Sequence, residues 1–126
     1  MPKFSLLKRI KSFSYAFNGL LILFKEEHNA RIHLFGAIVT TAAGFYFEIS
    51  KYEWLALILV IGLVITLEII NSAIEGIADF ISPNYHEMIK KIKDLGAAAV
   101  LTGAITAMII GGLIFIPKVL TLLLNH

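Results

Sequence analysis

The chain has 126 residues, a formal net charge of +2, 58% hydrophobic residues and a mean hydropathy of +0.83. This length predicts one domain, and the apolar fraction exceeds that of ordinary soluble domains, so the lipid bilayer is the expected solvent. The sequence contains no cysteine, which excludes disulfides, thiolate metal sites and cysteine nucleophiles. A cleavable signal peptide is not predicted, because basic and apolar residues alternate near the N-terminus.

The first predicted element is an amphipathic helix over residues 4–28. Its apolar residues recur at intervals of three and four, and polar residues such as Lys8, Lys11 and Tyr15 fall between them. A basic amphipathic helix of this kind is expected to lie on a membrane surface.

Three membrane spans are predicted to follow, over residues 32–50, 54–81 and 95–120. The third is the clearest, because residues 95–117 carry no formal charge and at ~1.5 Å per residue can cross a hydrocarbon core of ~30 Å. The apolar character of the first predicted span is weaker, since His33 and Glu48 lie near its ends. The predicted fold class is an all-α membrane protein with three transmembrane helices plus an N-terminal amphipathic surface helix.

The basic residues indicate how these spans are oriented. Nearly all of the 11 lysines and arginines precede the first span or lie between the second and third; only Lys51 and Lys118 fall on the other side. Positive charge accumulates on the cytoplasmic side of membrane proteins. We therefore expect a multi-pass protein of the cytoplasmic (inner) membrane, with the N-terminus and the second loop in the cytoplasm.

Residues 67–79, "LEIINSAIEGIAD", place polar side chains in an apolar span. At 100° per residue, Glu68, Asn71, Glu75 and Asp79 project within an arc of ~80°. Glu68 is expected ~18 Å from the cytoplasmic end of its helix, where a charge is unfavourable, so the stripe should face a polar cavity or a metal. The alternative is that the polar side chains only join neighbouring helices by hydrogen bonds.

Cations are expected near the same interface. Lys90, Lys91 and Lys93 precede the third span, and Glu27 and Arg31 are four residues apart at the start of the first. Carboxylates beside cations suit binding of a magnesium nucleotide, although the lysines alone would equally fit positive-inside anchoring. No phosphate-binding loop or soluble-kinase signature is present. His28 and His33 have no partner at metal-binding spacing and are interpreted as interfacial polar residues.

Two longer stretches carry a family resemblance. "EIINSAIEGIAD" (68–79) resembles the E-x-x-N-[ST]-A-I-E signature of the prokaryotic diacylglycerol kinase family, and "YHEMIKKIKDLGAAAV" (85–100) resembles its second signature. "EHNARIH" (27–33) and "SFSYAFNGL" (12–20) also fit this family of integral membrane lipid kinases. The resemblance implies a homotrimer of three-span subunits, with active sites shared between neighbours near the cytoplasmic face and MgATP as phosphoryl donor.

The resemblance also implies roles for individual residues. It makes Glu68 the catalytic base, Glu27 and Glu75 the magnesium ligands, and Asn71 and Arg31 supporting residues. Contacts to the nucleotide fall on Lys8, Tyr15, Glu27, Tyr85, His86, Lys93 and Asp94. Lys8 stands where better-known members have an arginine, with Arg9 adjacent, so either could reach ATP.

The predicted function is therefore that of a lipid kinase, which transfers the ATP γ-phosphate to the hydroxyl of diacylglycerol or undecaprenol. Expected partners are ATP, Mg²⁺ and the lipid alcohol, with no nucleic acid. "NARIHL" and "AIEGIADFISPNYH" look closer to the branch in which undecaprenol kinases occur. The alternative from another class is a proton or cation carrier that uses the acidic stripe as a relay.

Overall fold

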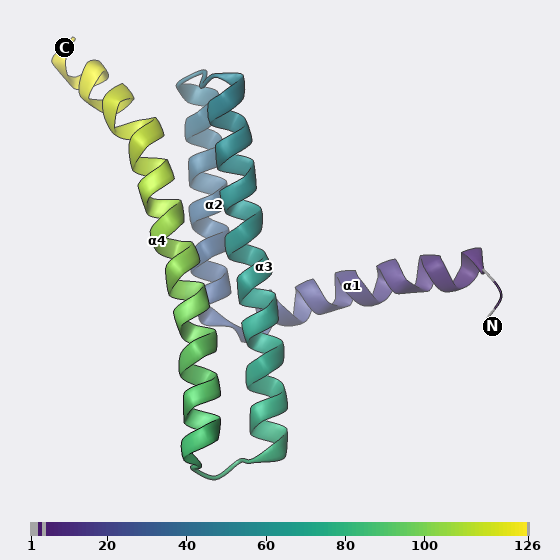
Figure 1. Ribbon diagram of the computed structural model, residues 1–126. Helices are drawn as coiled ribbons and strands as arrows, with labels where there is room; N and C mark the ends of the chain where they lie inside the picture. The colour runs from purple at the N-terminus through teal and green to yellow at the C-terminus, as the bar shows by residue number, and fades with distance from the viewer. Residues whose placement is uncertain (1–2, 4, 126) are drawn as a thin grey trace.

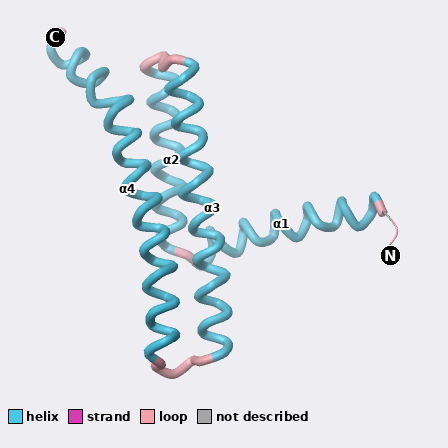
Figure 2. Tube along the Cα trace, in the orientation of Figure 1, coloured by secondary structure: helices cyan, strands magenta, loops and turns pink. Residues whose placement is uncertain are grey.

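The protein folds into four helices connected by short loops (Figures 1 and 2). The computed structural model describes residues 3 and 5–125, and in this part of the chain no strand occurs. The helices are α1 (Leu6–Glu26), α2 (His28–Tyr46), α3 (Lys51–Ile81) and α4 (Glu87–Leu124). The predicted all-helical class is confirmed.

Polar side chains define where the helices begin. The Ser5 hydroxyl accepts a hydrogen bond from the Lys8 N–H at the start of α1. At the start of α3, Ser50 and Glu53 satisfy each other's backbone N–H groups in a capping box. His86 is the N-cap residue of α4, and its Nδ1 accepts a hydrogen bond from the Met88 N–H at 3.1 Å. These caps replace the backbone partners that a first helical turn lacks.

Two of the helices, α3 and α4, are long and apolar enough to cross a membrane. The helix α2 does not meet the same criterion, because polar residues such as His28, Asn29 and Arg31 fill its first turn. Both apolar helices extend beyond their expected spans: α3 begins at Lys51 and α4 at Glu87. Two candidate spans are therefore observed, and α2 as a third stays a prediction.

Glycines of α4 allow α3 to approach closely. A Cβ atom at Gly103 would lie 2.7 Å from Leu67 Cδ1, which is closer than two carbon atoms can pack. Near the α2–α3 turn, Ile49, Leu57 and Ile114 form a small buried cluster, and Lys118 Nζ lies 2.7 Å from Glu53 Oε2. The α3–α4 pair is thus the packed framework of the chain, and α2 lies alongside it (Figure 1).

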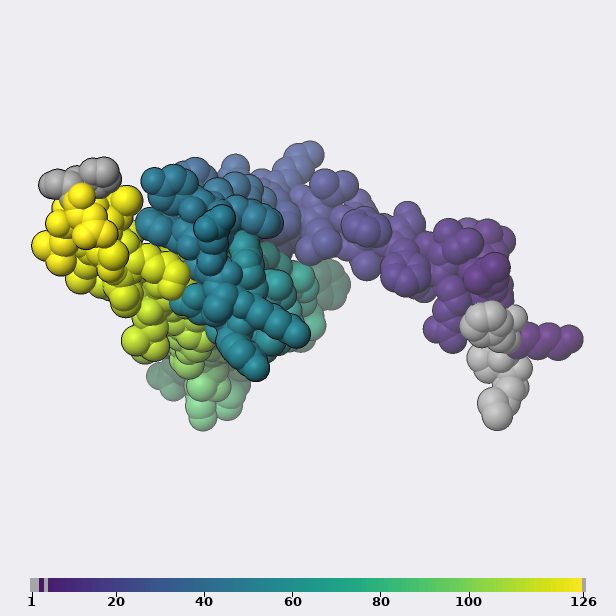
Figure 3. All heavy atoms as spheres, turned by 90° about the horizontal axis from the view of Figure 1, so that it is seen from above, coloured from purple at the N-terminus to yellow at the C-terminus, as the bar shows by residue number. Residues whose placement is uncertain are grey.

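The helix α1 extends sideways from the bundle, as Figure 1 and the view from above in Figure 3 show. Several of its apolar residues are exposed by 65% or more, namely Leu6, Phe13, Phe17 and Leu21, whereas Leu23, near the bundle, is buried. Such a face suits burial in lipid, as the sequence predicts for a surface helix. The end of α1 meets the bundle near Ser72 of α3, closer to the α3–α4 loop than to the α2–α3 turn, and both α3 and α4 continue past that level.

Candidate active site beside the break between α1 and α2

Glu68 is a charged residue buried inside the described part of the protein, with 4% of its surface exposed. It projects from α3, and its Oε1 lies 3.2 Å from Nε2 of His33 on α2. The same oxygen has no hydrogen-bond partner among the described residues. A buried carboxylate with an unsatisfied oxygen is unfavourable unless a ligand or substrate completes it.

The interpretation of His33 as an interfacial residue without a carboxylate partner is wrong. Residues 35 positions apart cannot be paired by local spacing, and the contact forms because α2 and α3 run antiparallel. Counted back from the turn between the two helices, His33 and Glu68 lie within about one helical turn of the same depth. That count is the signal that could have paired them. His28, in contrast, is exposed at the start of α2.

Glu27 lies in the break between α1 and α2, where its backbone is extended. Its Oε1 accepts a hydrogen bond from Ser72 Oγ of α3 at 3.1 Å. One turn farther along α3, Glu75 Oε1 accepts from Asn71 Nδ2 at 3.4 Å. The break therefore places Glu27 beside α3 at Ser72, which lies within about one helical turn of both Glu68 and Glu75 along that helix.

Asn71 is held between Glu75 and the backbone of α4. An ideal Cβ at Gly96 would collide with Asn71 Oδ1, and this oxygen is buried without a hydrogen-bond partner among the described residues. A side chain at position 96 would displace the amide that contacts Glu75. Gly96 is thus a site residue that the sequence analysis missed; a glycine at the start of the helix predicted over residues 95–120 was the available signal.

The ends of α3 and α4 near the loop that joins them form a second, more polar group. Lys93 of α4 forms an ion pair with Asp79, the fourth member of the predicted stripe. Asp79 is therefore bonded to α4 and not to the other polar residues of the stripe. Lys90 Nζ lies 2.7 Å from Asp94 Oδ2. A hollow of about 350 Å³ at this end brings together the predicted nucleotide contacts Tyr85, His86, Lys93 and Asp94.

Three predicted residues lie outside both groups. Lys8 and Tyr15 are on α1, which leads away from the bundle, and the Tyr15 residue is 70% exposed. Arg31 is exposed, and its backbone N–H donates to the Glu27 carbonyl oxygen. The Glu27 carboxylate accepts its hydrogen bond from Ser72 and forms no ion pair with Arg31 in the described structure.

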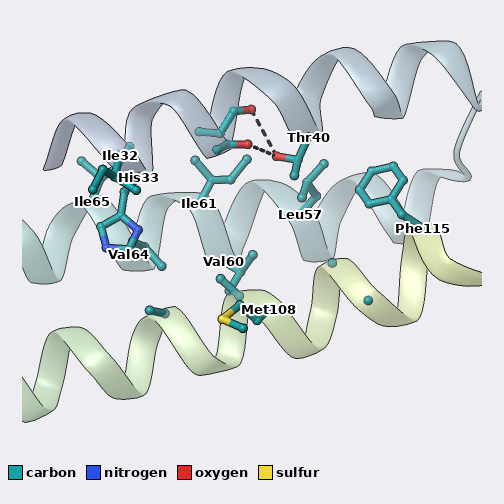
Figure 4. Close-up of a pocket in the computed structure, with 16 residues that line it drawn as sticks. Ile32, His33, Thr40, Leu57, Val60, Ile61, Val64, Ile65, Met108 and Phe115 are labelled. Carbon is teal, nitrogen blue, oxygen red and sulfur yellow. Dashed lines mark hydrogen bonds between the residues drawn. The ribbon is translucent and has the colours of Figure 1, made fainter. Parts of the chain in front are cut away.

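An apolar cavity of about 610 Å³ lies between α2, α3 and α4. In Figure 4, His33 lies at one end of it and Phe115 at the other. The Thr40 hydroxyl on its wall donates to the carbonyl oxygens of Gly36 and Ala37 and is satisfied within its own helix. The cavity therefore offers an apolar path from the far half of the bundle to the His33–Glu68 contact.

Comparison with known proteins identifies the family. Residues 14–115 match the sequence model of the family described as prokaryotic diacylglycerol kinase. The chain belongs to this family. The undecaprenol kinase of Bacillus subtilis (strain 168) is 39% identical over 108 residues, which cover 86% of this chain and 88% of that protein.

Other relatives carry the name diacylglycerol kinase, among them proteins of Escherichia coli and Synechocystis. The protein of Escherichia coli (strain K12) is 33% identical over 100 residues, or 79% of this chain and 82% of the relative. That of Synechocystis sp. is 36% identical over 113 residues, or 89% of this chain but 65% of the longer relative. The chain is thus a lipid kinase of a membrane-bound family, and the resemblance inferred from its motifs is confirmed. The carrier alternative finds no support in these names.

Proposed function

We propose that this family member transfers the γ-phosphate of ATP to the hydroxyl of a membrane lipid, with Glu68 as catalytic base. The observation that carries the proposal is the position of Glu68: a buried carboxylate with an unsatisfied oxygen lies beside one end of a long apolar cavity. A lipid tail in that cavity would bring its hydroxyl to the carboxylate. The remaining carboxylates lie on the cytoplasmic side of Glu68, toward the phosphates.

The proposed step moves one proton and one phosphoryl group. Glu68 accepts the proton of the lipid hydroxyl while the lipid oxygen forms a bond to the γ-phosphorus. The bond from the γ-phosphorus to the oxygen that bridges it to the β-phosphate breaks, and ADP leaves with that oxygen. The products are the phosphorylated lipid and ADP, and Glu68 then releases its proton to solvent.

The proposed magnesium ligands fit the chemistry of that ion. Glu27 and Glu75 offer carboxylate oxygens from neighbouring elements, and Ser72 and Asn71 orient them through hydrogen bonds. Mg²⁺ prefers one or two carboxylates together with phosphate oxygens and water. In the described part of the chain, no three His, Cys, Asp or Glu side chains lie together in a group that could hold a metal ion. When bound, Mg²⁺ neutralises charge on the β- and γ-phosphates.

The position of the membrane–water interface along α3 is inferred from α1. With α1 on the membrane surface, its junction with α2 places the interface near Ser72, because Glu27 bonds to that residue. Glu68 then lies one helical turn, or ~6 Å, below the interface, in place of the ~18 Å expected from the end of the helix. The hollow that contains Tyr85 and Lys93 lies beyond the interface, where water-soluble ATP would be.

We further propose undecaprenol as the preferred acceptor. Support comes from the undecaprenol kinase named among the relatives and from the elongated shape of the apolar cavity, which suits one hydrocarbon chain. Diacylglycerol presents two chains to the same opening. The preference is expected to appear in kcat/KM for the lipid, because contacts with the chain are made both in the bound state and during transfer.

Purified protein in mixed micelles with labelled ATP tests both parts of the proposal. Diacylglycerol, undecaprenol and ceramide are offered in parallel, and we expect the highest kcat/KM with undecaprenol. A higher value with diacylglycerol would overturn the acceptor assignment and leave the kinase assignment intact. Absence of labelled product with every lipid would overturn the proposed reaction.

We also propose a homotrimer in the cytoplasmic membrane, with α2 as its third span and the N-terminus and the α3–α4 loop in the cytoplasm. Support for shared sites comes from α1, which carries Lys8 and Tyr15 away from its own carboxylates (Figure 1). The base and the magnesium ligands would then come from one subunit, and the α1 contacts with ATP from its neighbour.

Mixed assemblies test the sharing. Subunits with Glu68→Gln and subunits with Tyr15→Ala, each inactive alone, should regain activity when reassembled together, because some sites then combine two intact contributions. Glu68→Gln mixed with Glu27→Ala is the matched control, assayed at a low Mg²⁺ concentration at which Glu27→Ala alone is inactive. This mixture should stay inactive, since both carboxylates lie in one chain. Activity is measured after subunit mixing has been verified. No rescue in the first mixture would place Tyr15 in the site of its own chain.

A further inference from the structure

We propose that His33 is a positioning residue that holds the Glu68 carboxylate at the lipid end of the site. This inference deepens the proposed function and rests on it. The imidazole Nε2 lies 3.2 Å from Glu68 Oε1, and His33 also lines the apolar cavity. One side chain thus contacts both the proposed base and the space proposed for the acceptor.

The charges around Glu68 explain why it needs this contact. Among the described residues, His33 is the basic side chain within ion-pair distance of Glu68. Two neighbouring carboxylates, Glu27 in the α1–α2 break and Glu75 on the stripe, carry charge of the same sign and disfavour an ionised Glu68. A buried carboxylate without a compensating donor or cation is strongly unfavourable.

Three lysines of the bundle form ion pairs elsewhere. Lys93 pairs with Asp79, Lys90 with Asp94, and Lys118 with Glu53 at the opposite end of α3. The pairs of Lys90 and Lys93 lie toward the cytoplasmic loop, away from the cavity. The imidazole of His33, contributed by α2, therefore supplies the positive or donor group that faces Glu68.

The close-up in Figure 4 places His33 at the end of the cavity, beside Ile32, Val64 and Ile65. The His33 side chain keeps 24% of its surface exposed, whereas that of Glu68 keeps 5%. A hydroxyl that arrives through the cavity would meet the imidazole and the carboxylate together. Proton transfer requires that the base lie within hydrogen-bond reach of the hydroxyl, and a flexible glutamate meets this requirement only when it is held in place.

The contact has the distance of an ion pair but makes no hydrogen bond. Catalytic hydrogen bonds are often poorly aligned before substrate binds and tighten in the complex. We therefore expect Nε2–H to donate to Glu68 once the acceptor fills the cavity. His33 does not accept the substrate proton in this arrangement; it acts through Glu68.

Three variants test the role in catalysis. His33→Leu removes the donor and should lower kcat for lipid phosphorylation about 10- to 100-fold, with KM for MgATP unchanged. His33→Gln should recover part of the loss, because its amide N–H can reach about the position of Nε2. His28→Leu is the matched control: His28 is exposed on the same helix, and its replacement should leave kcat unchanged.

A second measurement does not depend on activity. In protein labelled with ¹⁵N-histidine, the Nε2 resonance of His33, assigned by its loss in His33→Gln, should shift in Glu68→Gln. Resonances of the other three histidines should not shift. The spectrum reports on the contact even if the protein phosphorylates none of the lipids tested, so failure of the inference and failure of the proposed function are distinguishable.

Several results would overturn the inference. Wild-type kcat in His33→Leu would show that Glu68 needs no anchor, and an unchanged Nε2 resonance in Glu68→Gln would show that the two side chains do not interact. Equal losses in His33→Leu and His33→Gln, together with equally lowered unfolding temperatures, would make His33 a packing residue. If His33→Leu fails to assemble, His33→Gln is compared with the shorter His33→Asn, and equal activities would overturn the inference.

Discussion

Glu68→Gln is expected to lower kcat for lipid phosphorylation by about 100-fold or more, while MgATP still binds. Glutamine has nearly the same size as glutamate, so it should fill the same buried position against His33, but its amide cannot take the proton of the lipid hydroxyl. The measurement compares kcat, KM for MgATP and the mass of the assembly in wild type and variant. An interaction made only during transfer lowers kcat without raising KM.

Glu53→Gln is the matched control for this prediction. Glu53 lies on the same helix, at the opposite end, and glutamine can keep the capping box with Ser50. It should therefore keep close to wild-type kcat, although it weakens the contact with Lys118. A Glu68→Gln protein that assembles normally and turns over at the wild-type rate would rule out Glu68 as the base.

Alanine at Glu27 or at Glu75 is expected to raise the Mg²⁺ concentration needed for half-maximal activity by about 10-fold or more. Each carboxylate is oriented by a neighbour on α3, Ser72 for Glu27 and Asn71 for Glu75. Removal of one leaves Mg²⁺ with a single protein carboxylate and more water ligands, which weakens its hold at this site. The test is a magnesium titration of activity at constant MgATP saturation.

Glu26→Ala is the control for the magnesium titration. Glu26 is exposed at the last position of α1, directly before Glu27, and no hydrogen bond joins its side chain to α3 in the described structure. Its replacement changes the same charge without removing a proposed ligand, so the midpoint should move little. Unchanged midpoints in both Glu27→Ala and Glu75→Ala would place the magnesium ligands elsewhere.

Much of the local structure could be read from the sequence. The long apolar runs predict α3 and α4, because hydrophobic length is a local property, and Pro83 and Asn84 mark the loop between them. The periodicity of the polar stripe put Glu68, Asn71 and Glu75 on one face of a helix, since 3.6 residues per turn fixes that geometry. The resemblance to the lipid kinase family is carried by these same residues and is confirmed.

The long-range contacts required the tertiary structure. His33 with Glu68 and Ser72 with Glu27 join residues 35 and 45 positions apart, and no periodicity within one helix encodes them. Asp79 lies on the predicted face, yet it bonds to Lys93 because α4 begins early and passes beside it.

The sequence by itself determined the helices, the acidic stripe and the family, because each depends on residues close together in the chain. Only the tertiary structure decided that Glu68 is buried against His33, that Gly96 admits Asn71, and that a cavity leads to the base. These features depend on how antiparallel helices pack, and packing depends on the shapes of side chains distant in sequence. The position of the break at Glu27 relative to α3 is decided in the same way.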